Sequence, residues 1–275
     1  MEIAFWKYQG NGNDFIILDE RDSARQLTSV QVRKLCDRHF GIGADGLMTL
    51  KEAEHADFKM SYYNADGELA SMCGNGGRCI AMFANLMNIA PAEMSFEAYD
   101  GLHKAIVEEE LLEGRKYAVS LQMADVAGVE QSGNFYFLDT GSPHYVEFVE
   151  NLAEMDVFKE GSIIRFSERF SPGGTNVNFV ELKDKRLFVR TYERGVEDET
   201  LSCGTGVTAS AIAAFLKTGD KDFQIQTSGG EFRLSFEEDK GVFVKVCLHG
   251  PAEFVFKGQI KLIDNGDYHL NAITD

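Results

Sequence analysis

Two cysteines are the clearest candidates for reactive groups in this sequence. Cys73 lies in SMCGNGGRC and Cys203 in LSCGTGVTA, so both share the frame C-G-[NT]-G and stand 130 residues apart. Each glycine-rich turn leads into a run of apolar and small residues that predicts a helix. The first N–H groups of a helix are unsatisfied and carry the positive end of the helix dipole. A thiol placed there loses its proton more readily than a free cysteine, and the glycines let the backbone approach an anion.

Two such thiols predict proton transfer at carbon. If both loops face one bound amino acid, one thiolate can abstract the Cα proton while the other thiol protonates the opposite face. This exchange inverts the stereocentre without a redox change and needs no cofactor such as pyridoxal phosphate. Helix N-terminal amides aimed at the substrate carboxylate would stabilise the negative charge that develops in the transition state. No metal site is expected, because no two cysteines have the C-x₂₋₄-C spacing of a zinc site.

Polar residues near these loops fit an amino-acid pocket. Arg194, in YERG upstream of the second cysteine, can bind a carboxylate through two N–H groups, and Glu193 can accept hydrogen bonds from an ammonium. Asparagines offer a donor and an acceptor together in predicted turns and strand ends. They are Asn13, Asn64, Asn75 and Asn176.

Short strands dominate the rest of the chain, because runs of β-branched and aromatic residues alternate with Gly, Asp and Asn turns. The predicted strands are 3–8, 15–19, 58–63, 103–109, 117–123, 135–139, 177–182, 186–192, 223–227, 232–236 and 242–248. No regular strand–helix alternation is present, which argues against a doubly wound parallel sheet.

Three helices are predicted among these strands. The first spans residues 28–40, with a Thr28 cap and an apolar stripe that ends at Phe40. The other two, 75–88 and 205–218, follow the two cysteines, and Gly219 ends the second. Both are apolar or small around most of their circumference, which predicts buried helices.

An internal repeat organises these elements. GNDFII at 12–17 matches GSPHYV at 141–146 at an offset of 129, close to the spacing of the cysteine motifs. We therefore predict an α+β fold of two similar halves, each a mixed or antiparallel sheet wrapped around a buried central helix. The active site is expected at the interface of the halves. The predicted domains are 1–122, completed by 261–275, and 123–260.

The composition of the chain limits the classes of binding partner and the cellular location that we expect. The 275-residue chain carries a formal net charge of −17, which argues against nucleic acid and anionic membrane surfaces as partners. No stretch is apolar enough to span a bilayer, and no secretory signal is visible at the N-terminus. Five scattered cysteines do not form a disulfide framework, so we expect a reducing, cytoplasmic location.

The motifs together resemble one known family. In order, from residue 10 to residue 208, GNGNDFIILD, HFGIGADG, YYNADGELASMCGNGGRC, GSPHYV, NVNFVEL and YERGVEDETLSCGTG are similar to the diaminopimelate epimerase family. The resemblance implies interconversion of LL- and meso-2,6-diaminopimelate in lysine and peptidoglycan-precursor synthesis. It also implies the two-half epimerase fold, no cofactor and a homodimer.

The resemblance also implies roles for individual residues. Cys73 and Cys203 correspond to the acid/base pair, while His144 and Glu193 correspond to residues that orient the cysteines and tune their pKa. The backbone amides of four residues would bind the reacting carboxylate, and five side chains would bind the rest of the substrate. The first group is Gly74, Asn75, Gly204 and Thr205, and the second is Asn13, Asn64, Asn176, Glu193 and Arg194.

Three positions depart from the family pattern. Ser142 stands where many members have Asn, Gly46 where some have Gln, and Gln9 where many have His. The cysteine motifs themselves are intact.

Two alternative functions remain. One is another two-thiol racemase, acting on proline or hydroxyproline; Arg194 and the asparagines favour a substrate with a second polar end instead. The other is a PhzF-like or non-catalytic relative with the same fold, against which the retention of both cysteines argues. Cys36, Cys79 and Cys247 are expected in the core, and His39 is expected to be structural.

Overall fold

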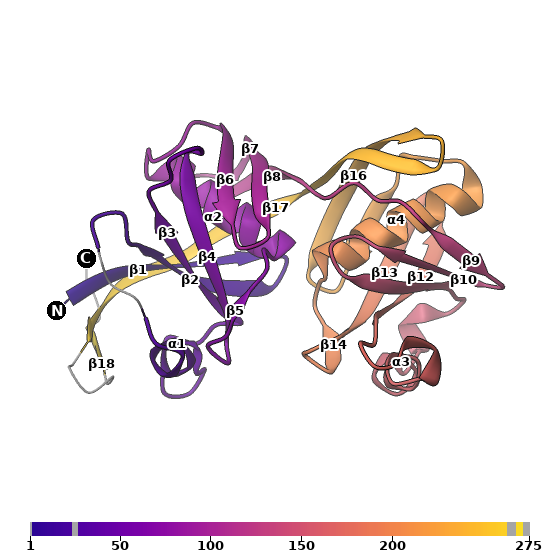
Figure 1. Ribbon diagram of the computed structural model, residues 1–275, viewed down its shortest axis with the longest axis horizontal. Helices are drawn as coiled ribbons and strands as arrows, with labels where there is room; N and C mark the ends of the chain where they lie inside the picture. The colour runs from indigo at the N-terminus through magenta and orange to yellow at the C-terminus, as the bar shows by residue number, and fades with distance from the viewer. Residues whose placement is uncertain (1, 24–26, 263–267, 272–275) are drawn as a thin grey trace. The chain divides into compact units, whose positions relative to one another are not determined.

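The computed structural model describes residues 2–23, 27–262 and 268–271 of the chain. The chain divides by its internal contacts into two compact units (Figure 1). Unit 1 comprises residues 1–121 and 251–275, and unit 2 comprises residues 122–250. The described residues are mostly strands with four α-helices. Within the described ranges, each helix is too short or too polar to reach across a lipid bilayer.

The strands of unit 1 form a closed barrel. The order around the barrel is β1, β2, β3, β4, β6, β7, β8 and β17, and β17 pairs again with β1. The β2–β3 and β4–β6 pairs are parallel, and the β1–β2, β3–β4, β6–β7, β7–β8 and β1–β17 pairs are antiparallel. Their bounds are β1 (Glu2–Gly10), β2 (Asn13–Asp19), β3 (Gly46–Lys51), β4 (Phe58–Asn64), β5 (Leu69–Ala70), β6 (Glu93–Ala98), β7 (Gly101–Leu112), β8 (Lys116–Gln122), β17 (Val242–Leu262) and β18 (Tyr268–Asn271).

Unit 2 repeats this pattern. Its strands pair in the order β9, β10, β11, β12, β13, β15, β16 and β17, with β14 added to β13. Here too two pairs are parallel, β11–β12 and β13–β15. The bounds are β9 (Glu130–Ser132), β10 (Phe135–Asp139), β11 (Pro143–Phe148), β12 (Asn176–Lys183), β13 (Arg186–Glu193), β14 (Asp198–Thr200), β15 (Gln224–Thr227) and β16 (Gly230–Asp239). The predicted repeat of two mixed sheets is therefore confirmed.

Each unit contains one strongly buried helix, α2 (Gly74–Leu86) in unit 1 and α4 (Gly204–Thr218) in unit 2. Helix α2 packs against β1, β2, β3 and β7, and α4 against β10, β11, β12, β13 and β16. Small residues permit this burial: a Cβ on Gly77 would lie 2.9 Å from Leu121 Cδ2. Gly219 ends α4 in the left-handed conformation with φ 79°, as predicted.

The other α-helices differ more from the sequence prediction. Thr28 caps α1 (Ser29–Cys36) as expected, but the helix ends at Cys36, and Phe40 is 87% exposed instead of lying on the buried stripe. Helix α3 (Val157–Arg165), capped by Asp156, was not predicted. Two short 3₁₀ helices, η1 (Leu152–Glu154) and η2 (Glu168–Phe170), flank it.

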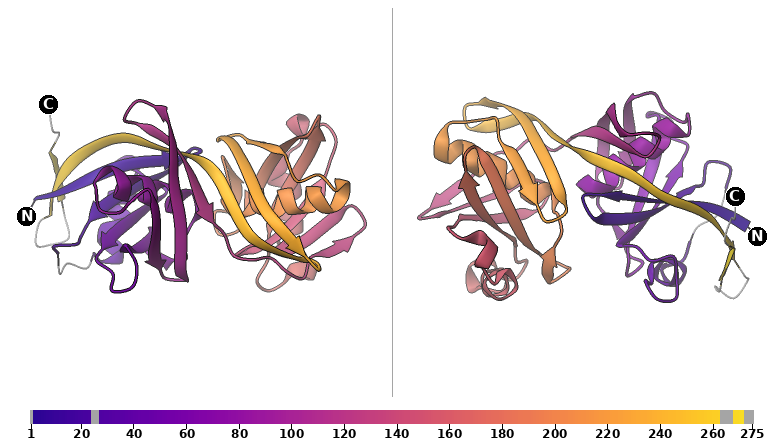
Figure 2. Two further views of the ribbon diagram at one scale, coloured as in Figure 1. Left: turned by 90° about the horizontal axis from the view of Figure 1, so that it is seen from above. Right: turned by 180° about the vertical axis from the view of Figure 1, so that it is seen from behind.

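One long strand belongs to both units. The sequence predicts that the strand at 242 ends at 248, whereas β17 continues through Pro251 to Leu262 (Figure 2). Its first part pairs with β16 in unit 2 and its last part with β1 in unit 1. Cys247 on this strand is only half-buried, so its expected core position is wrong, while Cys36 and Cys79 are buried as expected.

Candidate active site

The two cysteines occupy the same local position in their units. Cys73 is the N-cap of α2 and Cys203 the N-cap of α4, both with extended backbone. In each case the cysteine carbonyl accepts the first intrahelical bond, from Gly77 N at 2.7 Å and from Val207 N at 2.8 Å. Both side chains therefore lie beside the N–H groups at a helix start, which can bind an anion.

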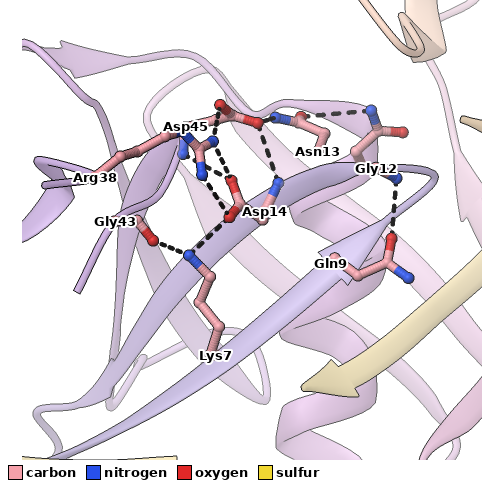
Figure 3. Close-up of polar contacts among 9 residues, drawn as sticks. Lys7, Gln9, Gly12, Asn13, Asp14, Arg38, Gly43 and Asp45 are labelled. Atoms are coloured by element: carbon pink, nitrogen blue, oxygen red, sulfur yellow. Dashed lines mark hydrogen bonds and ion pairs between the residues drawn. The ribbon is translucent and has the colours of Figure 1, made fainter. Parts of the chain in front are cut away.

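In unit 1, the structure brings Cys73 together with two of the predicted asparagines. Cys73 Sγ lies 3.5 Å from Asn13 Oδ1, and Asn75 Nδ2 donates to the same oxygen at 3.4 Å. Asn13 in turn donates through Nδ2 to Asp45 Oδ2 at 2.7 Å (Figure 3). Asn13 is therefore held between the cysteine loop and a carboxylate.

A charged cluster surrounds that carboxylate (Figure 3). Arg38 binds Asp14 Oδ1 at 2.8 Å and Asp45 Oδ1 at 2.6 Å, while Lys7 Nζ lies 2.8 Å from Asp14 Oδ2 and also contacts the carbonyl of Gly43. Burial by itself would raise the pKa of Asp14, but the hydrogen bonds from Arg38 and Lys7 lower it to about 2. The sequence prediction missed this cluster, although Arg38 and Asp45 lie in or beside HFGIGADG.

Helix α2 also contains a fully buried arginine that the sequence prediction missed. The Arg78 guanidinium donates to Asn75 Oδ1 at 2.9 Å, Asn11 Oδ1 at 2.8 Å and Gly74 O at 3.2 Å. Burial lowers its pKa to about 10, while electrostatic interaction with Cys79 and Cys73 acts in the opposite direction. Arg78 thus fixes the side chain of Asn75, two residues after Cys73.

The remaining candidates in unit 1 lie at the end of the β3–β4 pair. Asn64 ends β4, is exposed, and stands opposite Gly46 in the ladder. Its neighbour Ala65 donates to Asp45 O at 3.1 Å, which places this turn beside the charged cluster. At Gly46 a Cβ would lie 2.5 Å from Tyr62 Cε2, so the ring of Tyr62 requires glycine at this position.

In unit 2, hydroxyl groups connect Cys203 to a histidine. Cys203 Sγ lies 3.4 Å from Thr205 Oγ1, which lies 3.4 Å from Ser142 Oγ. Ser142 Oγ is 3.0 Å from His144 Nε2. Ser142 therefore stands between the cysteine loop and the histidine that the family resemblance singled out.

His144 is completely buried. Burial, with a smaller contribution from the charge of Arg194, lowers its pKa to about 3, so the imidazole is neutral at physiological pH. Its Nδ1 lies 3.0 Å from Nδ2 of Asn178, a fully buried residue that the sequence prediction missed although it lies within NVNFVEL. His144 is thus a neutral hydrogen-bonding group, and not a local positive charge.

The other candidates in unit 2 lie at the ends of β12 and β13. Asn176 donates through Nδ2 to Ser142 Oγ at 3.2 Å and accepts from Arg194 N at 2.9 Å. Glu193 Oε2 accepts from Thr200 Oγ1 at 2.9 Å. The Arg194 guanidinium donates to Gly173 O at 3.4 Å. Asn176 connects the Arg194 backbone to the hydroxyl network beside Cys203.

Solved structures define the class of fold. A Bacillus anthracis phenazine biosynthesis protein of the PhzF family aligns with a TM-score of 0.74 at 14% identity, covering 95% of this chain and 99% of that one. A probable proline racemase from Agrobacterium radiobacter gives 0.68 at 15% identity, covering 95% and 93%. A hydroxyproline epimerase from Agrobacterium vitis gives 0.67 at 14% identity, covering 94% and 92%. The fold is therefore one shared by racemases, epimerases and phenazine biosynthesis proteins.

Sequence relatives narrow this class to one family. The chain matches the diaminopimelate epimerase family over residues 5–124 and 136–255. The diaminopimelate epimerase of Flavobacterium psychrophilum is 49% identical, over 94% of this chain and all of that one. That of Chlorobaculum tepidum is 44% identical, over 92% of this chain and 99% of that one. The chain belongs to the diaminopimelate epimerase family, which confirms the resemblance drawn from its motifs.

Proposed function

We propose that this protein is a diaminopimelate epimerase that interconverts LL- and meso-2,6-diaminopimelate without a cofactor. The observation that carries the proposal is the pair of intact C-G-[NT]-G loops, each at the N-terminus of a buried helix, in a chain of this family. A diaminopimelate epimerase that is 49% identical over the whole of its own length supports the choice of substrate. A homodimer is proposed with it, on the family resemblance.

The chemistry follows from the two thiols. One of Cys73 and Cys203 removes the Cα proton as thiolate, and the other delivers a proton to the opposite face as thiol. This scheme requires both sulfurs to approach one Cα from opposite sides, which assigns the active site to the interface of the two halves, with α2 and α4 as their central helices. Each turnover conserves the number of protons on the pair.

The amides at the two helix starts bind the reacting carboxylate in this scheme. Negative charge grows on that carboxylate as the Cα proton leaves, and fixed N–H groups stabilise it without reorganisation. The amides belong to Gly74, Asn75, Gly204 and Thr205.

The polar side chains bind the rest of the substrate. Arg194 offers a guanidinium for a carboxylate and Glu193 an acceptor for an ammonium, while three asparagines supply paired donors and acceptors. These are Asn13, Asn64 and Asn176. A substrate with a second polar end, such as diaminopimelate, uses more of these groups than proline does.

The test is Cα–H exchange in D₂O, followed by NMR, with LL-diaminopimelate, lysine and proline as separate substrates. We expect exchange and epimerisation with diaminopimelate and much slower exchange with the other two. Cys73→Ala and Cys203→Ala should each lower epimerisation by about 10²–10⁴-fold, the usual contribution of a general acid or base.

Cys247→Ala is the matched control, because this cysteine is also only partly exposed but lies within strand β17 and not at a helix start. It should keep wild-type activity. Near-normal epimerisation by Cys73→Ala would disprove the two-base scheme, and equal rates with all three substrates would disprove the assignment to diaminopimelate.

A further inference from the structure

The two cysteines differ in their hydrogen-bond partners: Cys73 faces an acceptor, whereas Cys203 faces a donor. In unit 1, Asp45 sets the orientation of the Asn13 side-chain amide. The Asp45 carboxylate can only accept, so the NH₂ group of Asn13 must point toward Asp45. The carbonyl oxygen of Asn13 consequently faces Cys73 Sγ at 3.5 Å. Asn75 confirms this orientation, because Arg78 donates to its Oδ1 and leaves its NH₂ group to donate to Asn13. Cys73 therefore faces an acceptor, which favours S–H.

In unit 2, the direction is set by Asn178. Its Nδ2 donates to the carbonyl of Tyr145 at 2.9 Å, and its Oδ1 accepts from Thr191 Oγ1 at 2.9 Å, so the orientation of the amide is fixed. The second N–H of the same NH₂ group points at His144 Nδ1, which must accept. A neutral imidazole has one proton, and this places it on Nε2, toward Ser142.

Ser142 accepts a hydrogen bond from His144 and donates one toward the Cys203 loop. Its oxygen accepts from His144 Nε2 and from Asn176 Nδ2, so both lone pairs are used. The Ser142 hydroxyl proton then remains for Thr205 Oγ1, and the Thr205 proton for Cys203 Sγ, each across 3.4 Å. Cys203 therefore faces a donor, which favours the thiolate.

We propose that Ser142 is a positioning residue that relays the donor of His144 through Thr205 to Cys203, making Cys203 the base and Cys73 the acid of the resting enzyme. The proposal rests on the two-thiol function proposed above. In the first half-reaction the Cys203 thiolate takes the Cα proton and becomes S–H. Cys73 S–H gives its proton to the opposite face and becomes thiolate, so atoms and charge balance.

Charged groups lie beside the Cys73 loop in unit 1 and act on His144 in unit 2. Around Cys73 these are the cation Arg78 and the carboxylates Asp14, Asp45 and Asp100, the last of which accepts from the neighbouring Met72 N. In unit 2, Arg194 acts on His144, and Glu193 lies beside it in sequence. The cation and the carboxylates beside the Cys73 loop act on its thiol with opposite signs, so their effects partly offset one another. The direction of the hydrogen bonds distinguishes the two thiols.

The test is alkylation by iodoacetamide as a function of pH, without substrate, followed by peptide mass spectrometry. Cys203 is measured in the Cys73→Ala variant, and Cys73 in the Cys203→Ala variant. We expect Cys203 to react with a midpoint at least about one pH unit below that of Cys73, since the thiolate is the reacting form. A lower midpoint for Cys73, or equal midpoints, would overturn the assignment.

Substitution of Ser142 tests the relay itself. Ser142→Ala should slow alkylation of Cys203 at pH 7 about tenfold and leave Cys73 unchanged, while Ser142→Thr, which keeps the hydroxyl, should restore the rate. The control is Ser235→Ala, because Ser235 Oγ also lies 2.9 Å from a histidine, His249, in the same unit, but is not one of the groups that link His144 to Cys203. An unchanged Cys203 rate in Ser142→Ala would disprove the relay.

These readouts separate the two proposals. Epimerisation that needs both cysteines, combined with a reversed order of alkylation, would overturn the relay and leave the proposed function standing. Alkylation in the expected order, combined with epimerisation that survives Cys73→Ala, would overturn the proposed function and the roles of base and acid, and would leave the lower pKa of Cys203 standing.

Discussion

The loops around Cys73 and Cys203 have nearly the same backbone and different surroundings. Both cysteines are extended N-caps followed by glycine. At the repeat offsets of 129 and 130, Asn13 corresponds to Ser142 and Arg78 to Thr208. The Cys73 loop thus contacts a buried cation, Arg78, and is connected through Asn13 to a cluster of charged side chains. The corresponding groups around Cys203 are hydroxyls, amides and a neutral imidazole.

The difference shows which part of a duplicated site must stay the same. The backbone amides of a helix start can bind an anion whatever the side chains are, and both halves have the glycine-rich turn. The side chains beside each thiol affect its proton affinity, and a two-base inversion needs one thiol ionised while the other is protonated. In the proposed scheme, the repeated fold would supply two similar sets of helix-start amides for the carboxylate, and the divergent neighbours would supply the difference between the two thiols.

The largest expected difference between the loops lies in stability. Arg78→Met should lower the free energy of unfolding by about 3–5 kcal/mol, because several buried oxygen acceptors lose their donor together. Thr208→Val, at the corresponding position, should cost less than about 1 kcal/mol, since its hydroxyl bonds only Gly204 O among the contacts described. Urea unfolding of both variants measures the contrast, and equal losses would contradict it.

The second contrast is in acid sensitivity. The pKa of His144 is lowered to about 3, so between that value and about 6.5 the unfolded chain binds a proton that the folded protein does not. The stability from neutral His144 is complete above pH 6.5 and falls as the pH falls, by up to about 1.4 kcal/mol per pH unit. In unit 1, the pKa of Asp14 is lowered to about 2, so its stabilisation is lost only below about pH 4.

The free energy of unfolding of the wild type should fall between pH 6.5 and pH 5. In His144→Gln this fall should be smaller by up to about 2 kcal/mol, because the variant has no imidazole to titrate. His249→Gln serves as the control, because His249 is not fully buried. The measurement is urea unfolding at both pH values. A pH dependence in His144→Gln equal to that of the wild type would show that the histidine does not titrate in this way.

The smallest expected effect comes from the carboxylate that holds Asn13. Asp45→Asn can no longer fix the orientation of the Asn13 amide, so we expect kcat/KM to fall about tenfold, equivalent to about 1.4 kcal/mol. Stability should change by less than about 1 kcal/mol, because Asp45 and Arg38 are largely exposed. Asp19→Asn is the matched control, since Asp19 forms an exposed pair with Arg21 at the other end of β2. A similar loss of activity in both variants would contradict a specific role for Asp45.

Local sequence was sufficient for the parts of the fold that repeat. The helices after Cys73 and Cys203 were predicted to within a few residues, because glycine turns followed by small apolar residues occur in both halves. Strand β17 was predicted too short, because Gly250 and Pro251 signal a break. The strand tolerates that proline where it passes from the ladder of one unit to that of the other.

Two of the elements that were missed have weak local signals, whereas strands β3 and β11 were missed despite their apolar residues. Strand β6, EMSFEA, contains two glutamates, and helix α3 is short, with two β-branched isoleucines and a glycine. That glycine, Gly161, exists because a Cβ would lie 2.5 Å from Tyr192 Cβ, a contact between segments distant in sequence. Such pairing cannot be seen in a window of a few residues.

The candidate site divides in the same way. The cysteines and the glycines beside them can be found from a motif, because their chemistry depends on the backbone that follows. The roles of Asp45, Arg78 and Asn178 depend on which way an amide points, and that orientation is set by partners from other strands and helices.

Strand β17 also affects the order in which the protein can be completed during synthesis. Residues 242–250 finish unit 2, whereas the ladder of unit 1 receives its last strand from residues that pair with β1, up to Lys261. The first half to leave the ribosome therefore cannot complete its ladder at once. The edge of β1 that pairs with β17 stays open until residues up to Lys261 have been made. The N-terminal unit begins first and closes last.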